Sequence, residues 1–246
     1  MAGVQELRDF LDRSPSPWHA VATAAARLDA AGATAVSLDD AWGDVPAFGY
    51  VVDGGALIAW RLPAATPAPL RIVGAHTDSP GLRLHPDPAQ QTVANWQLLG
   101  VEIYGGVLLN SWLDRDLGVA GRVTGADGTT VLIDVAEPIA RVPQLAIHLD
   151  RNVNDGLTLD RHQHLRPVWA LDESIDPTAW LSARAGIAAS DWDLCFYDVQ
   201  PAAVLGADRS LLASGRLDNL LSCWAAIEAL GAATPDGAIA VAALFD

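Results

Sequence analysis

The chain has 246 residues, 51% of them hydrophobic and 18% charged, which is enough to bury one large core or two small ones. Its formal net charge is −15, from 30 acidic and 15 basic residues, and every basic residue is arginine. The acidic balance repels polyphosphate, so we expect no nucleic-acid partner. The absence of lysine excludes P-loop nucleotide sites, Schiff-base chemistry and Ser-Lys dyads.

The cysteines and the apolar stretches indicate neither an oxidising compartment nor a membrane. Cys195 and Cys223 are far apart in apolar surroundings, so we expect two buried thiols rather than a disulfide or a metal knuckle. Residues 1–11 carry charges and no apolar signal core, and the alanine-rich stretch 20–36 is interrupted by charges such as Arg27. We therefore expect a cytoplasmic protein with no membrane partner.

The chain begins with two predicted helices. The first is short and covers about residues 4–11. Ser16 followed by Pro17 has the form of a helix N-cap with proline at the first helical position, and Gly32 suits a C-terminal stop. We therefore predict a second helix over residues 17–31.

A hairpin and a buried strand follow. Two β-like runs, 48–52 and 56–60, flank Asp53-Gly54, which is a hairpin turn signal. A short run with β-branched residues, 71–75, then leads to the turn at Pro80-Gly81. This pattern predicts a central strand that gives way to a loop.

His76 and Asp78 lie where that central strand ends. Ligands collect at the carboxyl ends of strands in open α/β sheets, and residues two apart in an extended segment point to the same side. An imidazole nitrogen binds Zn²⁺ and a nearby carboxylate orients the imidazole, so this pair suits a metal site or a general base with its orienting carboxylate. The competing interpretation is a hydrogen-bonded pair that caps a loop, because His-x-Asp is common by chance.

From about residue 86 to residue 206 the chain is rich in short β-like runs separated by turn signals. We expect strands at 107–109, 118–123, 130–135 and 193–199, with one helix at 177–189. A β-rich unit between helix-and-strand segments indicates an inserted domain. We expect domain boundaries that give residues 1–85, 86–208 and 209–246.

The final segment returns to an α/β pattern. Ser214 is a candidate cap for a helix over residues 215–230, which carries an apolar stripe at helical spacing. The wholly apolar run 238–245 is typical of a buried parallel strand.

Asp218 and His148 are further candidates, each with a structural alternative. Asp218 lies near a helix start, where the helix dipole favours a carboxylate, but its two oxygens suit it to bridge two metal ions. His148 lies on an apolar, β-like run, 144–149, where a hydrogen-bonded core histidine is the default interpretation. The other histidines are interpreted as surface residues: His19, His85, His162 and His164.

Together these segments resemble the M18 family of aminopeptidases, the aspartyl aminopeptidases, over nearly the whole chain. Each motif alone is modest, but five in the same order are specific. They are Ser-Pro-Ser-Pro-Trp-His-Ala-Val at 14–21, Gly-Ala-His-Thr-Asp-Ser-Pro-Gly at 74–81, Trp-Leu-Asp-Arg-Asp-Leu at 112–117 with 121–123, the run 145–149 with 151–154, and Gly-Arg-Leu-Asp-Asn-Leu at 215–220.

The resemblance implies a fold, a cofactor and a role for each candidate. The implied fold is α/β, a zinc-exopeptidase-type α/β/α sandwich with an inserted β-rich domain. His76 matches a metal-binding histidine, Asp78 the catalytic aspartate that orients the site, and Asp218 the carboxylate that bridges two metals. His148 matches a histidine that reaches a neighbouring subunit's site, where it binds substrate or lies near the metal. The implied cofactor is two zinc ions, with other divalent metals as alternatives.

The resemblance also implies a substrate and an assembly. Family members remove N-terminal residues, typically Asp or Glu, from peptides in the cytoplasm. They assemble as tetrahedral homo-dodecamers whose inserted domains make subunit contacts. An acidic substrate needs a cationic pocket, and arginine is the only permanent cation here.

One departure from the family pattern concerns the residues expected after the last strand. In the family a His-Glu-Glu segment with the general base follows the position of Asp246, and further metal ligands come later. We therefore expect this chain to be the N-terminal part of a longer enzyme, incomplete for catalysis alone. Two alternatives stay open: a metal-dependent amidohydrolase acting on acylated amino acids, and a non-catalytic assembly fragment.

Overall fold

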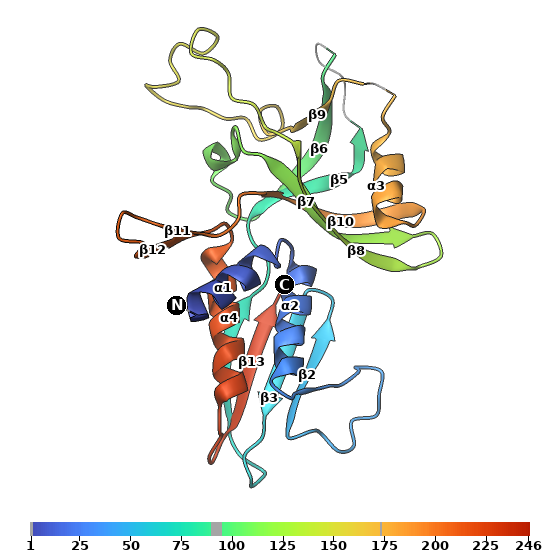
Figure 1. The fold of residues 1–246 in the computed structure, drawn as a ribbon. Coiled ribbons are helices and arrows are strands. Elements are labelled where there is room, and N and C mark those ends of the chain that lie inside the picture. The colour runs from blue at the N-terminus through green and yellow to red at the C-terminus, as the bar shows by residue number, and fades with distance from the viewer. Residues whose placement is uncertain (1, 90–94, 173) are drawn as a thin grey trace. The chain divides into compact units, whose positions relative to one another are not determined.

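A computed structural model of the chain describes the structure of residues 2–89, 95–172 and 174–246 (Figure 1). Two compact units emerge. Unit 1 joins Met1–Ser79 to Pro201–Asp246, and unit 2 is Pro80–Gln200. These divisions lie earlier in the chain than the expected boundaries at residues 85 and 208.

Three helices belong to unit 1: α1 (Ala2–Asp12), α2 (Pro17–Ala30) and α4 (Leu217–Ala232). The Ser16 side chain accepts a hydrogen bond from the His19 N–H and Pro17 opens α2, which confirms the predicted cap. The prediction that Ser214 caps α4 is wrong. The N-cap is Arg216, in the left-handed region at φ 60°, and no side chain caps this end.

The sheet of unit 1 has five strands in the order β1-β2-β3-β13-β4. Their bounds are Thr34–Ala35 (β1), Phe48–Asp53 (β2), Ala56–Arg61 (β3), Leu70–His76 (β4) and Ile239–Phe245 (β13). β2 and β3 form the predicted hairpin, whose turn places Gly54 at φ 58°. β13 runs parallel to β4 with Phe245 opposite His76, so both carboxyl ends reach the same end of the sheet.

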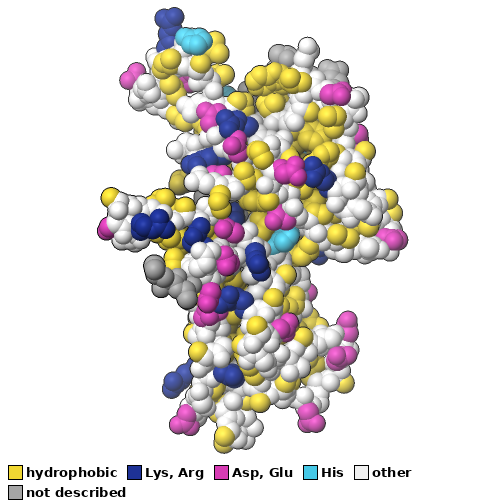
Figure 2. Space-filling model, in the orientation of Figure 1, with side chains coloured by type: hydrophobic (Ala, Val, Ile, Leu, Met, Phe, Trp, Pro, Cys, Tyr) yellow, Lys and Arg dark blue, Asp and Glu magenta, His cyan; other side chains and the backbone are white. Residues whose placement is uncertain are grey.

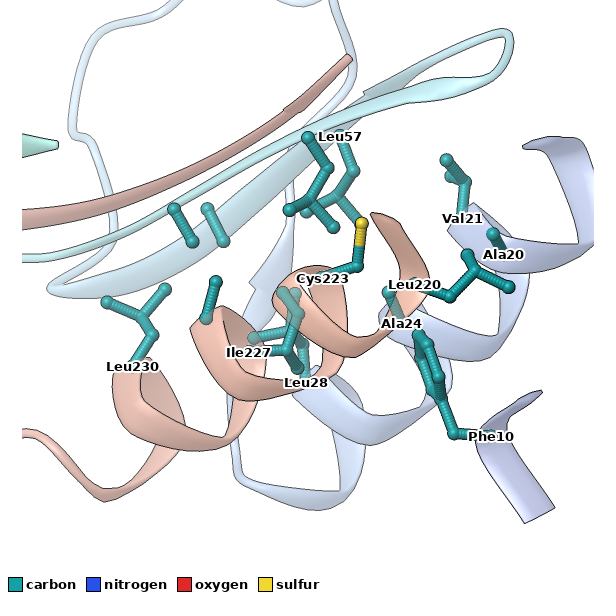
Figure 3. Packing of buried hydrophobic residues seen from close by; sticks show 14 of the residues in the cluster. Phe10, Ala20, Val21, Ala24, Leu28, Leu57, Leu220, Cys223, Ile227 and Leu230 are labelled. Carbon is teal, nitrogen blue, oxygen red and sulfur yellow. The ribbon is translucent and has the colours of Figure 1, made fainter. Parts of the chain in front are cut away.

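The three helices cover one face of this sheet. Phe10, Leu28 and Ile227, from α1, α2 and α4, pack with Leu57 of β3 and Leu244 of β13 in one buried cluster (Figure 3). The side chains that alternate with these along the strands point to the opposite face of the sheet. Several apolar residues of that face are 40% exposed or more, among them Ile58, Leu70 and Ile72.

Unit 2 is built from six strands in the order β8-β7-β10-β5-β6-β9. Their bounds are Gly81–Ala89 (β5), Gln97–Tyr104 (β6), Leu117–Gly125 (β7), Thr130–Ala140 (β8), Val168–Ala170 (β9) and Ala189–Asp198 (β10). Arg141, directly after β8, exchanges backbone hydrogen bonds of 3.0 and 2.8 Å with Val168 of β9. This bridge joins the two outer strands, so the sheet closes into a small barrel.

A second buried cluster fills the barrel, including Leu117, Val119, Leu194 and Phe196. The helix α3 (Pro177–Ala185) packs Leu181 against this cluster. Its N-cap is Asp176, whose carboxylate accepts the Ala179 N–H at 2.7 Å. Gly186 at φ 69° ends the helix, so it stops before the predicted residue 189.

Three further differences from the predictions concern short elements. The segment predicted as a strand at 107–109 leads instead into the 3₁₀ turn η1 (Leu109–Trp112). Gly81 already begins β5, which pairs with β6 and β10, so the first division falls before residue 85. The hairpin of β11 (Ala203–Leu205) and β12 (Leu211–Ala213) packs Leu212 on the unit 1 cluster, so the second division falls before residue 208.

The described residues also bear on two kinds of partner, a membrane and a nucleic acid. None of their helices combines the length and the apolar character needed to cross a bilayer. On the face shown in Figure 2, acidic and arginine side chains are interspersed rather than gathered by sign. That face therefore offers no broad cationic surface for a polyphosphate chain.

Candidate metal centre

The strand β4 delivers His76 to the end of the unit 1 sheet, and the next residue anchors it there. Thr77 donates its backbone N–H to the Phe245 carbonyl at 2.7 Å and its hydroxyl to the Gly55 carbonyl at 2.6 Å. Thr77 is buried. Thr77 is thus held through its backbone by β13 and through its side chain by the turn before β3. The sheet therefore sets the position of the neighbouring His76.

Asp78 orients the His76 imidazole. The His76 Nδ1 lies 3.0 Å from the Asp78 Oδ1 and 3.1 Å from the Asp78 carbonyl oxygen. Both partners are acceptors, so Nδ1 carries the proton and donates it. The lone pair of a neutral imidazole is then on Nε2, which is the arrangement that a metal-binding histidine needs.

Asp218 faces that same nitrogen. It lies in the first turn of α4, with φ −88° and ψ 106°, and the peptide between it and Asn219 is cis. Its Oδ1 lies 3.5 Å from the His76 Nε2, and its side chain is 90% exposed. The fold therefore brings together two side chains that are far apart in the sequence.

The separation of these two atoms suits a shared metal ion. Two ligand atoms about 2.1 Å from a tetrahedral zinc lie about 3.4 Å from each other. The 3.5 Å between Nε2 and Oδ1 matches that spacing. Among the described residues no group of three or more His, Cys, Asp or Glu side chains is placed so that it could hold a metal ion, so His76 and Asp218 are two candidate ligands and not a full ligand set.

His148 does not lie on a strand, so the prediction of a β-like run at 144–149 is wrong. The segment is irregular, and His148 lies in an exposed turn. The apolar residues of this run are Leu145, Ile147 and Leu149, which are 60%, 51% and 68% exposed. A strand needs a neighbour for its backbone groups, and apolar composition alone does not supply one.

The other histidines have structural partners. His19 Nδ1 lies 2.7 Å from the Ser16 hydroxyl at the start of α2, and His85 Nε2 lies 3.8 Å from Glu102 on the barrel. His164 Nδ1 accepts the Asp160 N–H at 2.9 Å in an exposed turn that also contains His162. His162 and His164 are exposed, as their interpretation as surface residues requires, whereas His19 and His85 are half-buried.

Two residues of the site were missed from the sequence. Asn219 Oδ1 accepts the backbone N–H of His76 at 3.2 Å, and Cys223 Sγ donates to the His76 carbonyl at 3.1 Å. Burial and the nearby Asp78 carboxylate raise the pKa of the Cys223 thiol to about 12, so it stays protonated and able to donate. Asn219 and Cys223 are four residues apart, a spacing that places two side chains on the same face of a helix. This spacing was the signal that the sequence offered. Cys223 is buried as predicted, whereas Cys195 is half-buried.

The sequence matches one family model over residues 10–246, and that model is described as aminopeptidase I zinc metalloprotease (M18). The chain belongs to the M18 family. This confirms the resemblance carried by its five motifs, and the family description names zinc as the metal.

Individual M18 relatives match over nearly the whole chain. A protein of Streptomyces coelicolor named probable M18 family aminopeptidase 2 is 51% identical over 98% of this chain and 59% of its own length. One of the same name from Mycobacterium leprae is 44% identical over 100% and 60%. The structure of Chaetomium thermophilum mApe1 has a TM-score of 0.87 at 30% identity, covering 98% of this chain and 61% of that one. This chain thus spans about 60% of the length of these relatives.

Proposed function

We propose that the complete protein carrying this chain is a zinc-dependent aminopeptidase, and that His76 and Asp218 are two of its metal ligands. The observation that carries the proposal is the 3.5 Å separation of Nε2 and Oδ1 at the carboxyl end of β4, in a chain of the M18 family. Zinc bound there would supply a Lewis acid that polarises a peptide carbonyl and acidifies water.

The residues of this chain hold and orient the site. Asp78 accepts a hydrogen bond from the His76 Nδ1–H, which would leave the Nε2 lone pair available to a metal ion. Asp218 has one oxygen beside Nε2, and its exposed carboxylate would suit a ligand shared by two metal ions. We therefore assign two zinc ions to the complete site, with further ligands and the general base supplied from outside this pair.

The substrate we assign is the N-terminal residue of a peptide, with a preference for Asp or Glu. The support is the resemblance of the motifs to aspartyl aminopeptidases. The net charge of −15 disfavours an acidic peptide at long range, so the preference has to come from local contacts with arginine. Release rates from peptides that begin with Asp, Glu, Leu or Arg would test this assignment directly.

Metal analysis tests the ligand assignment in the protein expressed from its natural gene. We expect about two zinc ions per chain, since a bridging carboxylate holds a pair. His76→Ala and Asp218→Ala should each lower zinc affinity by about 100-fold or more, because each removes one ligand. The matched control is His85→Ala, which removes another histidine paired with a carboxylate and should leave zinc unchanged.

The results also separate the alternatives. A wild-type protein that binds no zinc would favour a non-catalytic assembly protein. Zinc binding with hydrolysis of acylated amino acids but not of peptides would favour an amidohydrolase. Unchanged zinc affinity in His76→Ala would contradict the site itself.

We further infer a homo-oligomer in which His148 reaches the site of a neighbouring subunit and binds substrate there. Two observations support it: His148 is exposed, and the apolar side chains on both sides of it, Ile147 and Leu149, are exposed as well. Neighbouring exposed apolar side chains are a feature of protein–protein contact surfaces. Assembly into a tetrahedral dodecamer is the form that the resemblance implies.

A further inference from the structure

The backbone polar groups of His76 point away from the strand that neighbours β4. The Thr77 N–H bonds to Phe245 of β13, and backbone groups alternate between the two edges of a strand from one residue to the next. The His76 N–H and carbonyl therefore face the opposite edge. There the Asn219 amide accepts the N–H and the Cys223 thiol donates to the carbonyl, so α4 takes the place of a neighbouring strand.

The hydrogen bond to His76 determines which way the Asn219 amide points. Only Oδ1 can accept an N–H, so it faces His76 and leaves Nδ2 on the other side of the amide group. Nδ2 donates to the Asp218 Oδ1 at 3.3 Å. This oxygen is the one that lies 3.5 Å from the His76 Nε2. One planar amide thus contacts the backbone of one candidate ligand and the carboxylate of the other.

These contacts constrain different parts of the ligand pair. The Asp218 side chain is 90% exposed, so few packing contacts restrict its rotation. The Nδ2–H bond directs one carboxylate oxygen, while the Oδ1 bond holds the end of β4 beside the first turn of α4. Without the amide, the carboxylate is free to take other rotamers, and it has to lose that freedom when a metal binds.

We propose that Asn219 is a positioning residue that sets the spacing between His76 Nε2 and the Asp218 carboxylate before zinc binds. The proposal rests on the proposed function, because it assumes that this pair holds zinc. Hydrogen bonds to metal ligands typically contribute about 10- to 100-fold to metal affinity. Asn219 should therefore affect zinc affinity without itself being a ligand.

The test uses zinc-free protein expressed from its natural gene, and measures zinc affinity by competition with a chromophoric chelator. Asn219→Ala, and the nearly isosteric Asn219→Leu, should each weaken zinc binding about 10- to 100-fold without changing the number of ions bound. The cobalt(II) absorption spectrum should also change, because it reports ligand geometry. Melting curves in excess chelator measure the stability of each variant without metal.

The matched control is Ile227→Ala, which opens a cavity two turns further along α4. Ile227 is 2% exposed and belongs to the core, so this variant should lower the melting temperature while zinc affinity and the cobalt spectrum stay as in wild type. Equal zinc loss in Ile227→Ala and Asn219→Ala would overturn the proposal, as would wild-type affinity in Asn219→Ala or failure of both Asn219 variants to fold. A wild-type protein without zinc would instead refute the proposed function.

Discussion

At the scale of single residues, Tyr50 makes one of several hydrogen bonds that link the helices of unit 1 to its sheet. The Tyr50 hydroxyl of β2 donates to the Asp29 Oδ1 of α2 at 2.8 Å. Tyr50 is 6% exposed, and its burial, together with the bond to the carboxylate, raises its pKa from 10.0 to about 12. The folded protein therefore holds this proton more tightly than the unfolded chain does.

We predict a stability loss at high pH that depends on Tyr50. Between pH 10 and pH 12 the unfolded chain loses the Tyr50 proton and the folded protein keeps it, so the unfolded state binds fewer protons and stability falls as pH rises. The contribution is complete below pH 10. Tyr50→Phe should cost about 1 kcal/mol near neutral pH, from the lost bond, and should flatten this alkaline decline.

Urea unfolding at a series of pH values, with the absorbance of ionised tyrosine followed in parallel, measures both effects. A decline of the same steepness in wild type and in Tyr50→Phe would show that other groups cause it.

Residues of the candidate site differed in how well the sequence predicted them. His76 and Asp78 could be predicted, because a strand end and a spacing of two are local features. Asp218 needed the family resemblance, since a carboxylate near a helix start has a structural explanation of its own. Asn219 was missed because its bond to His76 links positions 143 apart, and only the folded path of the chain brings them together.

At the scale of elements, the pairing of β7 with β10 depends on one glycine. Gly121 lies at φ 150° opposite Leu194, a conformation that side chains rarely adopt. A Cβ at this position would collide with the carbonyl oxygen of Asp193 on β10. The close approach of the two backbones is therefore possible only with glycine.

We predict that Gly121→Ala destabilises unit 2 by about 3 kcal/mol or more, because backbone strain and a backbone clash add. Gly128→Ala is the control. Gly128 also has a positive φ, 83°, but nothing lies within 4 Å of its Cβ position, so we expect a loss of about 1 kcal/mol. Denaturant unfolding measures the free energy of unfolding of both variants. The difference between them gives the cost of the collision, because only the backbone strain is common to both. Equal losses would contradict the importance of the close approach.

Elements with their own local signals could be predicted, and elements defined by distant partners could not. The N-cap signal at Ser16-Pro17 predicted α2, and the turn signal at Asp53-Gly54 predicted the hairpin of β2 and β3. The strand β5 was missed because it contains Pro86 and Pro88, which are unfavourable in a paired strand. Both prolines lie between Leu84 and Ala89, where the register of the pairing with β6 shifts, so neither has to take part in a regular ladder.

At the scale of the whole molecule, the division into two parts could be predicted from the sequence, because α/β and all-β segments differ in the spacing of their apolar residues and in their turn signals. The boundaries of each part could not be predicted. They depend on which cluster a connecting segment packs against, as for Leu212 of β12. A charge of −15 without lysine shapes the surface of the molecule, and it does not determine the fold.

The proposed role of His148 gives a prediction that only an assembly can satisfy. If each active site combines the metal ligands of one subunit with the His148 of its neighbour, then Asp218→Ala and His148→Ala each inactivate the protein alone. Co-expressed in equal amounts, they form mixed oligomers in which some sites join an intact Asp218 to an intact His148. Random mixing restores about a quarter of wild-type activity, because each site draws its two parts independently.

The control is co-expression of Asp218→Ala with His76→Ala. Both variants break the metal pair within one subunit, so mixing cannot rebuild a site and peptide release should stay at background. Oligomeric mass and a different purification tag on each variant verify that mixed particles form. Background activity in confirmed mixed particles of Asp218→Ala and His148→Ala would show that His148 acts within its own subunit. Full activity of His148→Ala alone would show that it does not contribute to the site.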